Sequence, residues 1–398
     1  MKSPPQTIAI VGAGVAGSRL AYLLARNGKS VMLFDHKAPW EKPCGGGLSP
    51  KIVWEYPELK NLVAEGRVHR RLKMQFPFGR RVSLSLTWPM VTISRQGLGQ
   101  KLLDMALAEG AAFHQQKVMA VEPEGEAMVL RTDAGQYKAD FVVGADGVGS
   151  IVRKAFAGKF PREDLCLTHF ALLPGKVKLP LVLRFFKGFQ GYAWIFPRND
   201  ATAVGIALER GEAKDEDLSA RLHEFVEDEF GRAGLEIPDL SGERAWFLPA
   251  LRTASFEDPK LSGDGWALIG DASGSADPLT GEGIFYAFKT AELLGKAVCS
   301  EDRDGMKSYP QSWKTMARLS IGKVSRVTEK FYRPFTLRVI GFCLDYSPSV
   351  RIITRELVAG MQDYDTLKPK VKSDALKYAG EVVVNFLARQ KGERKKKR

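Results

Sequence analysis

The stretch TIAIVGAGVAG, residues 7–17, decides the fold of this chain. Its first five residues are mostly β-branched and apolar, a pattern that predicts a short buried strand. Gly12, Gly14 and Gly17 follow at the spacing of a dinucleotide-binding turn, where they permit a tight turn, close approach of a pyrophosphate, and packing of a helix on the strand. The stretch therefore predicts dinucleotide binding. The alternative is a Rossmann-like unit that has lost its ligand.

The residues that follow complete this unit. Leu20, Leu23 and Leu24 recur at helical spacing, and Asn27 with Gly28 predicts the end of that helix. The segment SVMLFD, residues 30–35, then predicts a second strand that ends at Asp35. An acidic side chain at this position can bind ribose hydroxyl groups.

Composition narrows the class of protein and its partners. The chain has 398 residues, 44% of them hydrophobic, and a formal net charge of +13. This charge favours acidic partners, namely an anionic membrane surface, a phosphorylated substrate or an acidic electron-transfer protein. No nucleic-acid module or metal-ligand spacing is recognisable, so we expect neither nucleic acid nor a metal. Scattered cysteines and the lack of a long apolar run predict a cytoplasmic protein without a membrane span.

Two later segments identify the dinucleotide. They are GADGVGSIVR, residues 144–153, and GDASGSADPLTGEG, residues 270–283, and each follows a predicted buried strand. Together with residues 7–17, they resemble the fingerprints of the FAD-containing aromatic-hydroxylase superfamily. The resemblance implies that Asp271 carries the ribityl chain and that a helix beginning after Gly283 faces the flavin ring. A helix N-terminus there would stabilise the anionic reduced flavin.

The resemblance implies a larger set of cofactor residues, drawn from all the matching segments. It includes Arg95, at the start of a helix predicted from the spacing of Leu98 and Leu102. It also includes Val118, on a strand that covers the adenine end in that superfamily. The FAD-binding residues that we expect are Gly12, Gly14, Ala16, Gly17, Asp35, Cys44, Gly45, Gly46, Arg95, Val118, Asp146, Asp271, Pro278, Gly281, Gly283 and Ile284.

The segment EKPCGGGLSP, residues 41–50, contains three consecutive glycines. Because glycine is entropically costly, such a run suggests that the backbone passes close to something large, although a surface turn is the alternative. In the superfamily this segment runs beside the flavin ring, which implies that the flavin lies against the glycines. A cysteine followed by glycines here resembles the geranylgeranyl reductase family.

The segment GYAWIFP, residues 191–197, supports the same family. It matches the Tyr-x-Trp-x-Phe-Pro signature of geranylgeranyl reductases, with Gly205 some residues later. In a strand, Tyr192, Trp194 and Phe196 face one way, while Ala193 and Ile195 face the other. The resemblance implies that Tyr192, Trp194, Phe196 and Pro197 form an aromatic substrate wall. The alternative is an ordinary sheet core.

The resemblance implies an FAD-dependent reductase that hydrogenates isolated double bonds of a prenyl lipid or prenyl diphosphate. We hypothesise that Cys44 supplies the proton, because a thiol in an apolar pocket stays protonated at neutral pH. The alternative is that Cys44 only packs against the flavin. Either NADPH or reduced ferredoxin would supply electrons. A monooxygenase or halogenase on the same scaffold, and a flavin-bearing lipid-binding protein without turnover, remain open.

The expected fold class is α/β, with a Rossmann-type FAD-binding domain interleaved with a mostly antiparallel substrate sheet. The FAD-binding domain would comprise residues 1–65, 90–160 and 262–300, and the substrate domain residues 66–89 and 161–261. Residues 301–398 should be a helical C-terminal region. Its basic tail, KGERKKKR, is expected to be disordered. Such basic clusters beside apolar helices can bind anionic lipid, which predicts peripheral contact with the inner face of a membrane.

Overall fold

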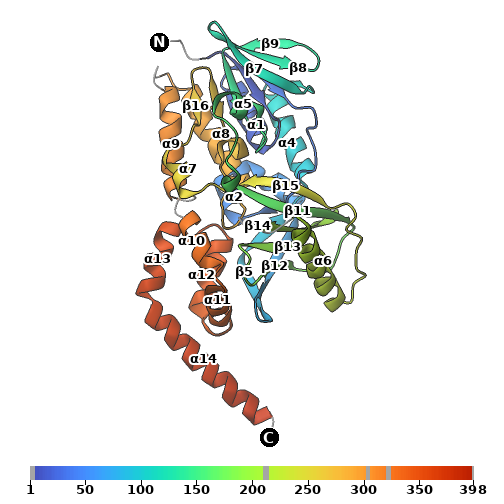
Figure 1. Cartoon of the computed structure of the whole chain (residues 1–398), viewed down its shortest axis with the longest axis vertical. Coiled ribbons are helices and arrows are strands. Elements are labelled where there is room, and N and C mark those ends of the chain that lie inside the picture. The colour runs from blue at the N-terminus through green and yellow to red at the C-terminus, as the bar shows by residue number, and fades with distance from the viewer. Residues whose placement is uncertain (1–4, 209–214, 302–304, 320–323, 397–398) are drawn as a thin grey trace. The chain divides into compact units, whose positions relative to one another are not determined.

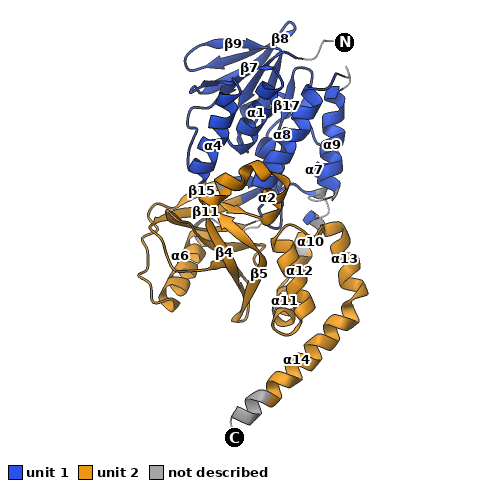
Figure 2. Cartoon of the chain, turned by 180° about the vertical axis from the view of Figure 1, so that it is seen from behind, with its two compact units in different colours: residues 1–42, 94–166, 247–325 blue, residues 43–93, 167–246, 326–398 orange. Residues whose placement is uncertain are grey.

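The computed structural model of the protein describes residues 5–208, 215–301, 305–319 and 324–396. The chain forms two compact units, each assembled from three segments (Figure 2). The first unit comprises residues 1–42, 94–166 and 247–325, and the second comprises residues 43–93, 167–246 and 326–398. The expected α/β fold class, with a helical C-terminal region, is confirmed.

The first unit is built on a six-stranded sheet. In spatial order its strands are β16 (Ser262–Gly263), β17 (Trp266–Leu268), β10 (Phe141–Gly144), β1 (Thr7–Val11), β2 (Ser30–Phe34) and β6 (Ala112–His114). All neighbours pair in parallel except β16 with β17. The chain runs from β1 to β2 on one side and later returns to β10 on the other. In such sheets, ligands bind where the strand order reverses, at the carboxyl ends of the strands.

Helices pack around this sheet, and the end of the first of them agrees with the capping residues in the sequence. Its helices are α1 (Val15–Arg26), α4 (Arg95–Ala108), α5 (Ile151–Phe156), α7 (Thr253–Glu257), α8 (Ile284–Val298) and α9 (Gly305–Leu319), with the short turns η2 (Arg162–Asp164) and η3 (Gly270–Ser273). Helix α1 packs against α4 and α8. It ends where predicted, because Asn27 is its C-cap and Gly28 takes a φ of 76°. A separate antiparallel sheet contains β7 (Val118–Glu124), β8 (Ala127–Thr132) and β9 (Gln136–Ala139).

The second sheet has eight strands. Their order is β15 (Arg244–Pro249), β11 (Leu165–Pro174), β14 (Ala201–Leu208), β13 (Gly191–Pro197), β12 (Leu181–Phe185), β4 (Arg67–Phe76), β5 (Arg80–Thr92) and β3 (Gly47–Leu48). The sheet is mostly antiparallel, as expected, although β12 and β4 pair in parallel.

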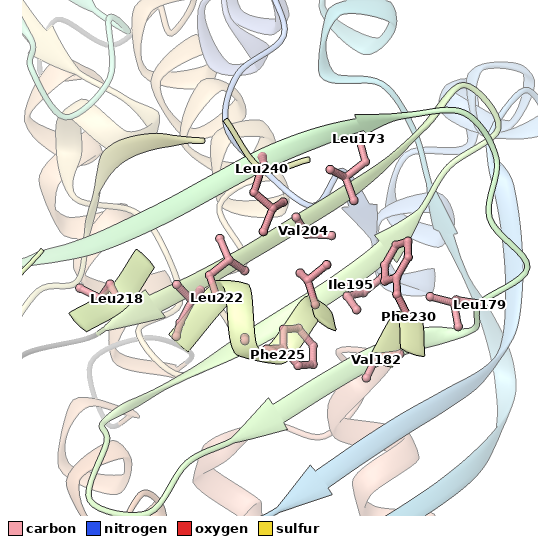
Figure 3. Packing of buried hydrophobic residues seen from close by; sticks show 14 of the residues in the cluster. Leu173, Leu179, Val182, Ile195, Val204, Leu218, Leu222, Phe225, Phe230 and Leu240 are labelled. Atoms are coloured by element: carbon pink, nitrogen blue, oxygen red, sulfur yellow. The ribbon is translucent and has the colours of Figure 1, made fainter. Parts of the chain in front are cut away.

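One face of this second sheet is covered by α6 (Asp215–Arg232), a helix that the sequence analysis did not predict. Leu218, Leu222 and Phe225 of α6 are fully buried against the sheet. They meet Ile195 and Val204, which lie on neighbouring strands (Figure 3). The spacing of these α6 side chains is helical, so the signal was present in the sequence.

The C-terminal region is helical. Its elements are α10 (Val324–Phe331), α11 (Pro334–Tyr346), α12 (Pro348–Val358), α13 (Tyr364–Ser373) and α14 (Ala375–Lys396), shown in orange and red in Figure 1. The short elements α2 (Pro50–Glu55), η1 (Pro57–Leu59) and α3 (Lys60–Ala64) precede β4. The expected disorder of the basic tail is wrong as far as Lys396, because its Lys, Arg and Glu residues are good helix formers that extend α14. Among the described residues, no helix combines the length and apolar character that crossing a bilayer requires.

Candidate flavin and substrate site

The glycine-rich turn after β1 is shaped by three different contacts. Gly12 has a φ of 101°, and a Cβ added there would lie 2.5 Å from the carbonyl oxygen of Ala145. A Cβ at Gly17 would lie 1.8 Å from the carbonyl oxygen of Gly12. A Cβ at Gly14, in contrast, would meet nothing within 4 Å. Two glycines therefore permit tight packing, and the third leaves the backbone open to a ligand.

Asp35 fixes this turn from the end of β2. One carboxylate oxygen, Oδ2, accepts a hydrogen bond from the N–H of Ala13 at 2.9 Å. The other, Oδ1, accepts from the N–H groups of Lys37 and Ala38 at 2.8 and 3.0 Å. A carboxylate has about four acceptor positions. Asp35 can therefore hold the turn and still accept a ribose hydroxyl group.

Two helices in the first unit begin at glycines. Gly14 is the N-cap of α1 and Gly283 is the N-cap of α8, and neither helix has a side-chain cap. The turn before α8 is held by Asp277, whose Oδ1 accepts from the N–H groups of Leu279 and Thr280. The positive ends of both helix dipoles are therefore free of capping carboxylates. A pyrophosphate and an anionic reduced flavin are the groups that such ends stabilise.

The acidic side chain of Asp271 lies beside the start of α8. A Cβ on Gly283 would lie 3.4 Å from its Oδ1 atom, and its Oδ2 atom lies 2.5 Å from Nζ of Lys42. Sequence reasoning missed Lys42, and it also missed Glu41. The carboxylate of Glu41 accepts from Oγ of Ser94 at 2.7 Å and so buttresses the start of α4. Both residues precede the glycine run, where their charges were visible in the sequence.

Two predicted cofactor residues carry polar atoms that need a partner. Nε of Arg95 and Oδ1 of Asp146 are buried, and neither has a hydrogen-bond partner within the described residues. The other oxygen of Asp146 accepts from the N–H of Ile151 at 2.7 Å. Burial raises the pKa of Asp146 to about 6. Buried polar atoms are normally paired, so these two suit a polar ligand such as FAD.

Four of the remaining predicted cofactor residues of this unit are buried, whereas Gly281 is exposed. Val118 packs in a core cluster with Phe34 and Leu130, and its contact with adenine stays a prediction. Ala16 and Ile284 are each 6% exposed. Pro278 is buried, and Gly281 takes a φ of 71° in the turn before α8.

The glycine run of the second unit lies against aromatic side chains. A Cβ on Gly45 would lie 2.5 Å from Cδ2 of Phe196 and 3.2 Å from Nε1 of Trp194. A Cβ on Gly47 would lie 3.0 Å from the Phe196 ring. Gly46 has a φ of 68° and little space beside the carbonyl oxygen of Ile93. The sequence analysis attributed the glycines to a flavin ring, whereas the structure gives them a second reason, the aromatic wall itself.

The aromatic wall has the predicted alternation. Tyr192, Trp194 and Phe196 of β13 lie on the same face of the sheet as Phe170 of β11, while Ala193 and Ile195 belong to the core beneath α6. Trp194 pairs with Gly205 on β14, and a Cβ there would lie 2.3 Å from the indole ring. The indole N–H of Trp194 is buried without a hydrogen-bond partner in the described part of the chain.

A buried histidine supports the end of the wall. The carbonyl oxygen of Pro197 accepts a hydrogen bond from Oγ1 of Thr92 at 2.6 Å. Nε2 of His69 lies 2.9 Å from both Thr92 Oγ1 and Pro197 O. Burial lowers the pKa of His69 to about 4. His69 is therefore neutral at physiological pH and stiffens the strand that carries the wall.

Comparison with known proteins identifies the family. The family profile described as "FAD binding domain" matches residues 6–309, about three quarters of the chain. The chain belongs to this FAD-binding family. It is an FAD-dependent oxidoreductase, and the two uncapped helix ends with the unpartnered atoms of Arg95 and Asp146 fit that cofactor. When bound, FAD would supply redox chemistry to the residues described above.

Curated relatives and solved structures agree with the resemblance to geranylgeranyl reductases. Digeranylgeranylglycerophospholipid reductase 2 of Methanothermobacter thermautotrophicus is 27% identical over 81% of this chain and 86% of its own length. Menaquinone reductase of Mycobacterium tuberculosis is 28% identical over 74% of this chain and 77% of its own. The structure of a geranylgeranyl bacteriochlorophyll reductase-like protein from Thermoplasma acidophilum has a TM-score of 0.75 at 19% identity, covering 92% of this chain and 98% of that one. The resemblance is confirmed.

Proposed function

We propose that this protein is a reductase that hydrogenates isolated carbon–carbon double bonds in the prenyl chain of a lipid. The observation that carries the proposal is the direct contact between the Cys44-bearing glycine run and the wall of Trp194 and Phe196. A proton-donating group and an apolar aromatic surface are adjacent within one unit. The names of two relatives add support, because digeranylgeranylglycerophospholipid reductase 2 and menaquinone reductase are both named for a lipid that they reduce.

An isolated alkene makes specific demands on the protein. It has no carbonyl group to polarise it, so addition of hydride requires a proton on one carbon while positive charge develops on the more substituted carbon. When bound and reduced, FAD would supply the hydride. The chain's own residues must exclude water, hold the prenyl chain in place and stabilise the developing charge. The faces of Tyr192, Trp194 and Phe196 suit all three demands, because aromatic faces attract cations.

Cys44 is the proton donor in this proposal. Its Sγ atom accepts a hydrogen bond from the N–H of Gly46 at 3.4 Å, which orients the side chain while leaving the thiol proton available. The side chain is half-buried, and the thiol is free rather than part of a disulfide. Within the aromatic wall, Trp194 and Phe196 carry no acidic proton, and the phenol of Tyr192 is ordinarily a weaker acid than a thiol.

The electron donor in this proposal is NADPH or reduced ferredoxin. Anaerobic mixing of the FAD-loaded protein with each donor in turn distinguishes them. The compound that reduces the bound flavin at least as fast as turnover is identified as the electron donor. The other compound should leave the flavin oxidised.

Mass spectrometry of the product tests the proposed reaction. The FAD-loaded protein is reduced under anaerobic conditions and incubated with prenyl lipids and prenyl diphosphates. The proposal predicts a gain of two hydrogen atoms per double bond, without incorporation of oxygen. A product that forms only in air and contains an added oxygen or halogen atom would instead identify a monooxygenase or halogenase. Binding of lipid and FAD without any product would identify a non-catalytic binding protein.

A further inference from the structure

A row of buried hydrogen bonds connects helix α9 with the turn η3, which carries Asp271. The row begins at Trp313 of α9, whose side chain is fully buried, and ends at the carbonyl oxygen of Gly270. Helix α9 belongs to the first unit and packs against α8 (Figure 2). Trp313 lies beyond residues 6–309, the part of the chain that matches the FAD-binding family. The match to that family therefore says nothing about its role.

Three hydrogen bonds form this row. The indole N–H of Trp313 donates to Oγ of Ser275 at 2.7 Å. Oγ of Ser275 lies 2.7 Å from Oγ of Ser273, which in turn donates to the carbonyl oxygen of Gly270 at 2.7 Å. Ser273 and Ser275 are 2% and 0% exposed, so the protein itself must satisfy their hydroxyl groups. We call Trp313, Ser275 and Ser273 the Trp313 network.

The donors of the Trp313 network all point the same way. An indole N–H can only donate, and each serine hydroxyl group has one proton. Because Ser273 donates to Gly270, the proton of Ser275 lies on the hydrogen bond between the two serines. Hydrogen bonds in such a row strengthen one another, and loss of one member leaves a buried polar atom unpaired.

The peptide at Gly270 is held from two helices. Its N–H donates to Oγ1 of Thr290 in α8 at 3.0 Å, while its carbonyl oxygen accepts from the Trp313 network. Its φ is 57°, and a Cβ added there would lie 2.9 Å from Cβ of Ala16, so the turn fits closely against α1. The next residue along the chain is Asp271, which pairs with Lys42. The position of the Asp271 carboxylate therefore depends on how Gly270 is held.

We propose that Trp313, acting through Ser275 and Ser273, is a positioning residue of the flavin site. The Trp313 network holds η3 so that the carboxylate of Asp271 lies where it can contact FAD. The three side chains act through the backbone of the turn rather than by contact with the cofactor. A role in packing alone would need no hydroxyl groups, because an apolar core of the same shape has no hydrogen bonds to satisfy. The inference goes beyond the proposed reaction and does not depend on it, because it concerns FAD binding alone.

Titration of the full-length apoprotein with FAD tests the inference. Ser273→Ala and Ser275→Ala each break the network and should weaken FAD binding about fivefold, which corresponds to the loss of one hydrogen bond. Trp313→Phe removes the first donor and should act in the same direction. The double variant Trp313→Phe with Ser275→Ala should bind FAD as tightly as Ser275→Ala does, because both changes interrupt the same connection. The visible circular dichroism of the bound flavin should change in all of these variants.

Tyr309→Phe is the matched control, because it also removes a single buried hydroxyl group. The Tyr309 side chain is fully buried in the same helix, and its hydroxyl group donates to the carbonyl oxygen of Leu268 at 2.6 Å. Leu268 belongs to β17, which is also held by its pairing with β10. Like Ser275→Ala, this variant should have a lower melting temperature than the wild type. Its dissociation constant for FAD should stay within about twofold of the wild-type value, and its flavin spectrum should be unchanged.

Two results would overturn the inference. One is an equal loss of FAD affinity in Tyr309→Phe and Ser275→Ala, which would mean that α9 only stabilises the fold. The other is wild-type affinity and an unchanged flavin spectrum in folded Ser273→Ala and Ser275→Ala variants. If Trp313→Phe does not fold, the two serine variants decide the question, because each removes only a hydroxyl group.

Discussion

Phe196 occupies the space that a side chain at position 45 would need. The distance from an added Cβ on Gly45 to Cδ2 of Phe196 is 2.5 Å, closer than any ordinary contact between carbon atoms. The thiol-bearing segment and the aromatic wall are therefore fitted to each other. The sequence predicted that the glycine run passes close to something large, with a surface turn as the alternative, and in the folded protein Phe196 packs closely against it.

Gly45→Ala should destabilise the second unit. Overpacking of this kind costs about 1–3 kcal/mol, which chemical denaturation can measure. The added methyl group has no room unless the ring moves, so the second change Phe196→Leu should remove part of the penalty. Gly231→Ala is the matched control, because Gly231 lies within α6 and an added Cβ meets nothing within 4 Å. This control should stabilise the protein by about 0.5–1 kcal/mol. Equal stability of Gly45→Ala and the wild type would contradict the packing described here.

Gly14→Ala and Gly17→Ala should have different effects. An added methyl at Gly14 meets no protein atom, so folding stability should fall only by the cost of alanine at a helix N-cap, about 1 kcal/mol, yet the methyl group would obstruct a pyrophosphate. We expect FAD affinity to fall at least about tenfold, a change of about 1.4 kcal/mol, in equilibrium titration of the apoprotein. At Gly17 an added Cβ would lie 1.8 Å from the carbonyl oxygen of Gly12, so unfolding free energy itself should fall. Unchanged FAD affinity in a folded Gly14→Ala variant would be incompatible with this assignment.

His69 should make folding sensitive to acid. Burial lowers its pKa to about 4 in the folded protein, below the ordinary value of 6.5. The unfolded chain therefore binds the proton more readily, so stability is fully present above about pH 6.5 and is lost as the pH falls toward 4. His69→Gln keeps a donor for the carbonyl oxygen of Pro197 but cannot titrate. Between about pH 6.5 and pH 4.5, this variant should lose about 2 kcal/mol less than the wild type. Parallel pH dependences of the two proteins would rule out this role.

Cys44→Ala should slow prenyl reduction without impairing FAD binding. Loss of a positioned proton donor typically costs about 100-fold in rate or more, and single-turnover kinetics under anaerobic conditions would measure it. Cys343→Ala is the control, because it removes another free, partly buried thiol from the same unit. If both variants react at the wild-type rate, Cys44 only packs in the site and another group supplies the proton.

The sequence predicted those parts of the structure that depend on local patterns. The strand at residues 7–11, the glycine turn and the helix that ends before Asn27 occur where expected. The alternation of Tyr192, Trp194 and Phe196 is also local, because it follows from the geometry of a strand. These features depend on residues that are neighbours in the chain.

The missed features depend on contacts between distant segments. Lys42 and Asp271 are separated by 229 positions, and no periodicity links them. The reason for Gly45 lies in Phe196, which the sequence analysis assigned to the wall without linking it to the glycines. The missed helix α6 is different, since Leu218, Leu222 and Phe225 already stand at helical spacing.

The most direct test follows the flavin itself during a single turnover. The FAD-loaded protein is reduced chemically without oxygen, and geranylgeranyl diphosphate or a prenylated lipid is then added while flavin absorbance is recorded. The account predicts that the absorbance of oxidised flavin returns with at least one of these compounds, in proportion to the double bonds reduced. Flavin that stays reduced with every prenyl compound, and reoxidises only when air is admitted, would contradict it.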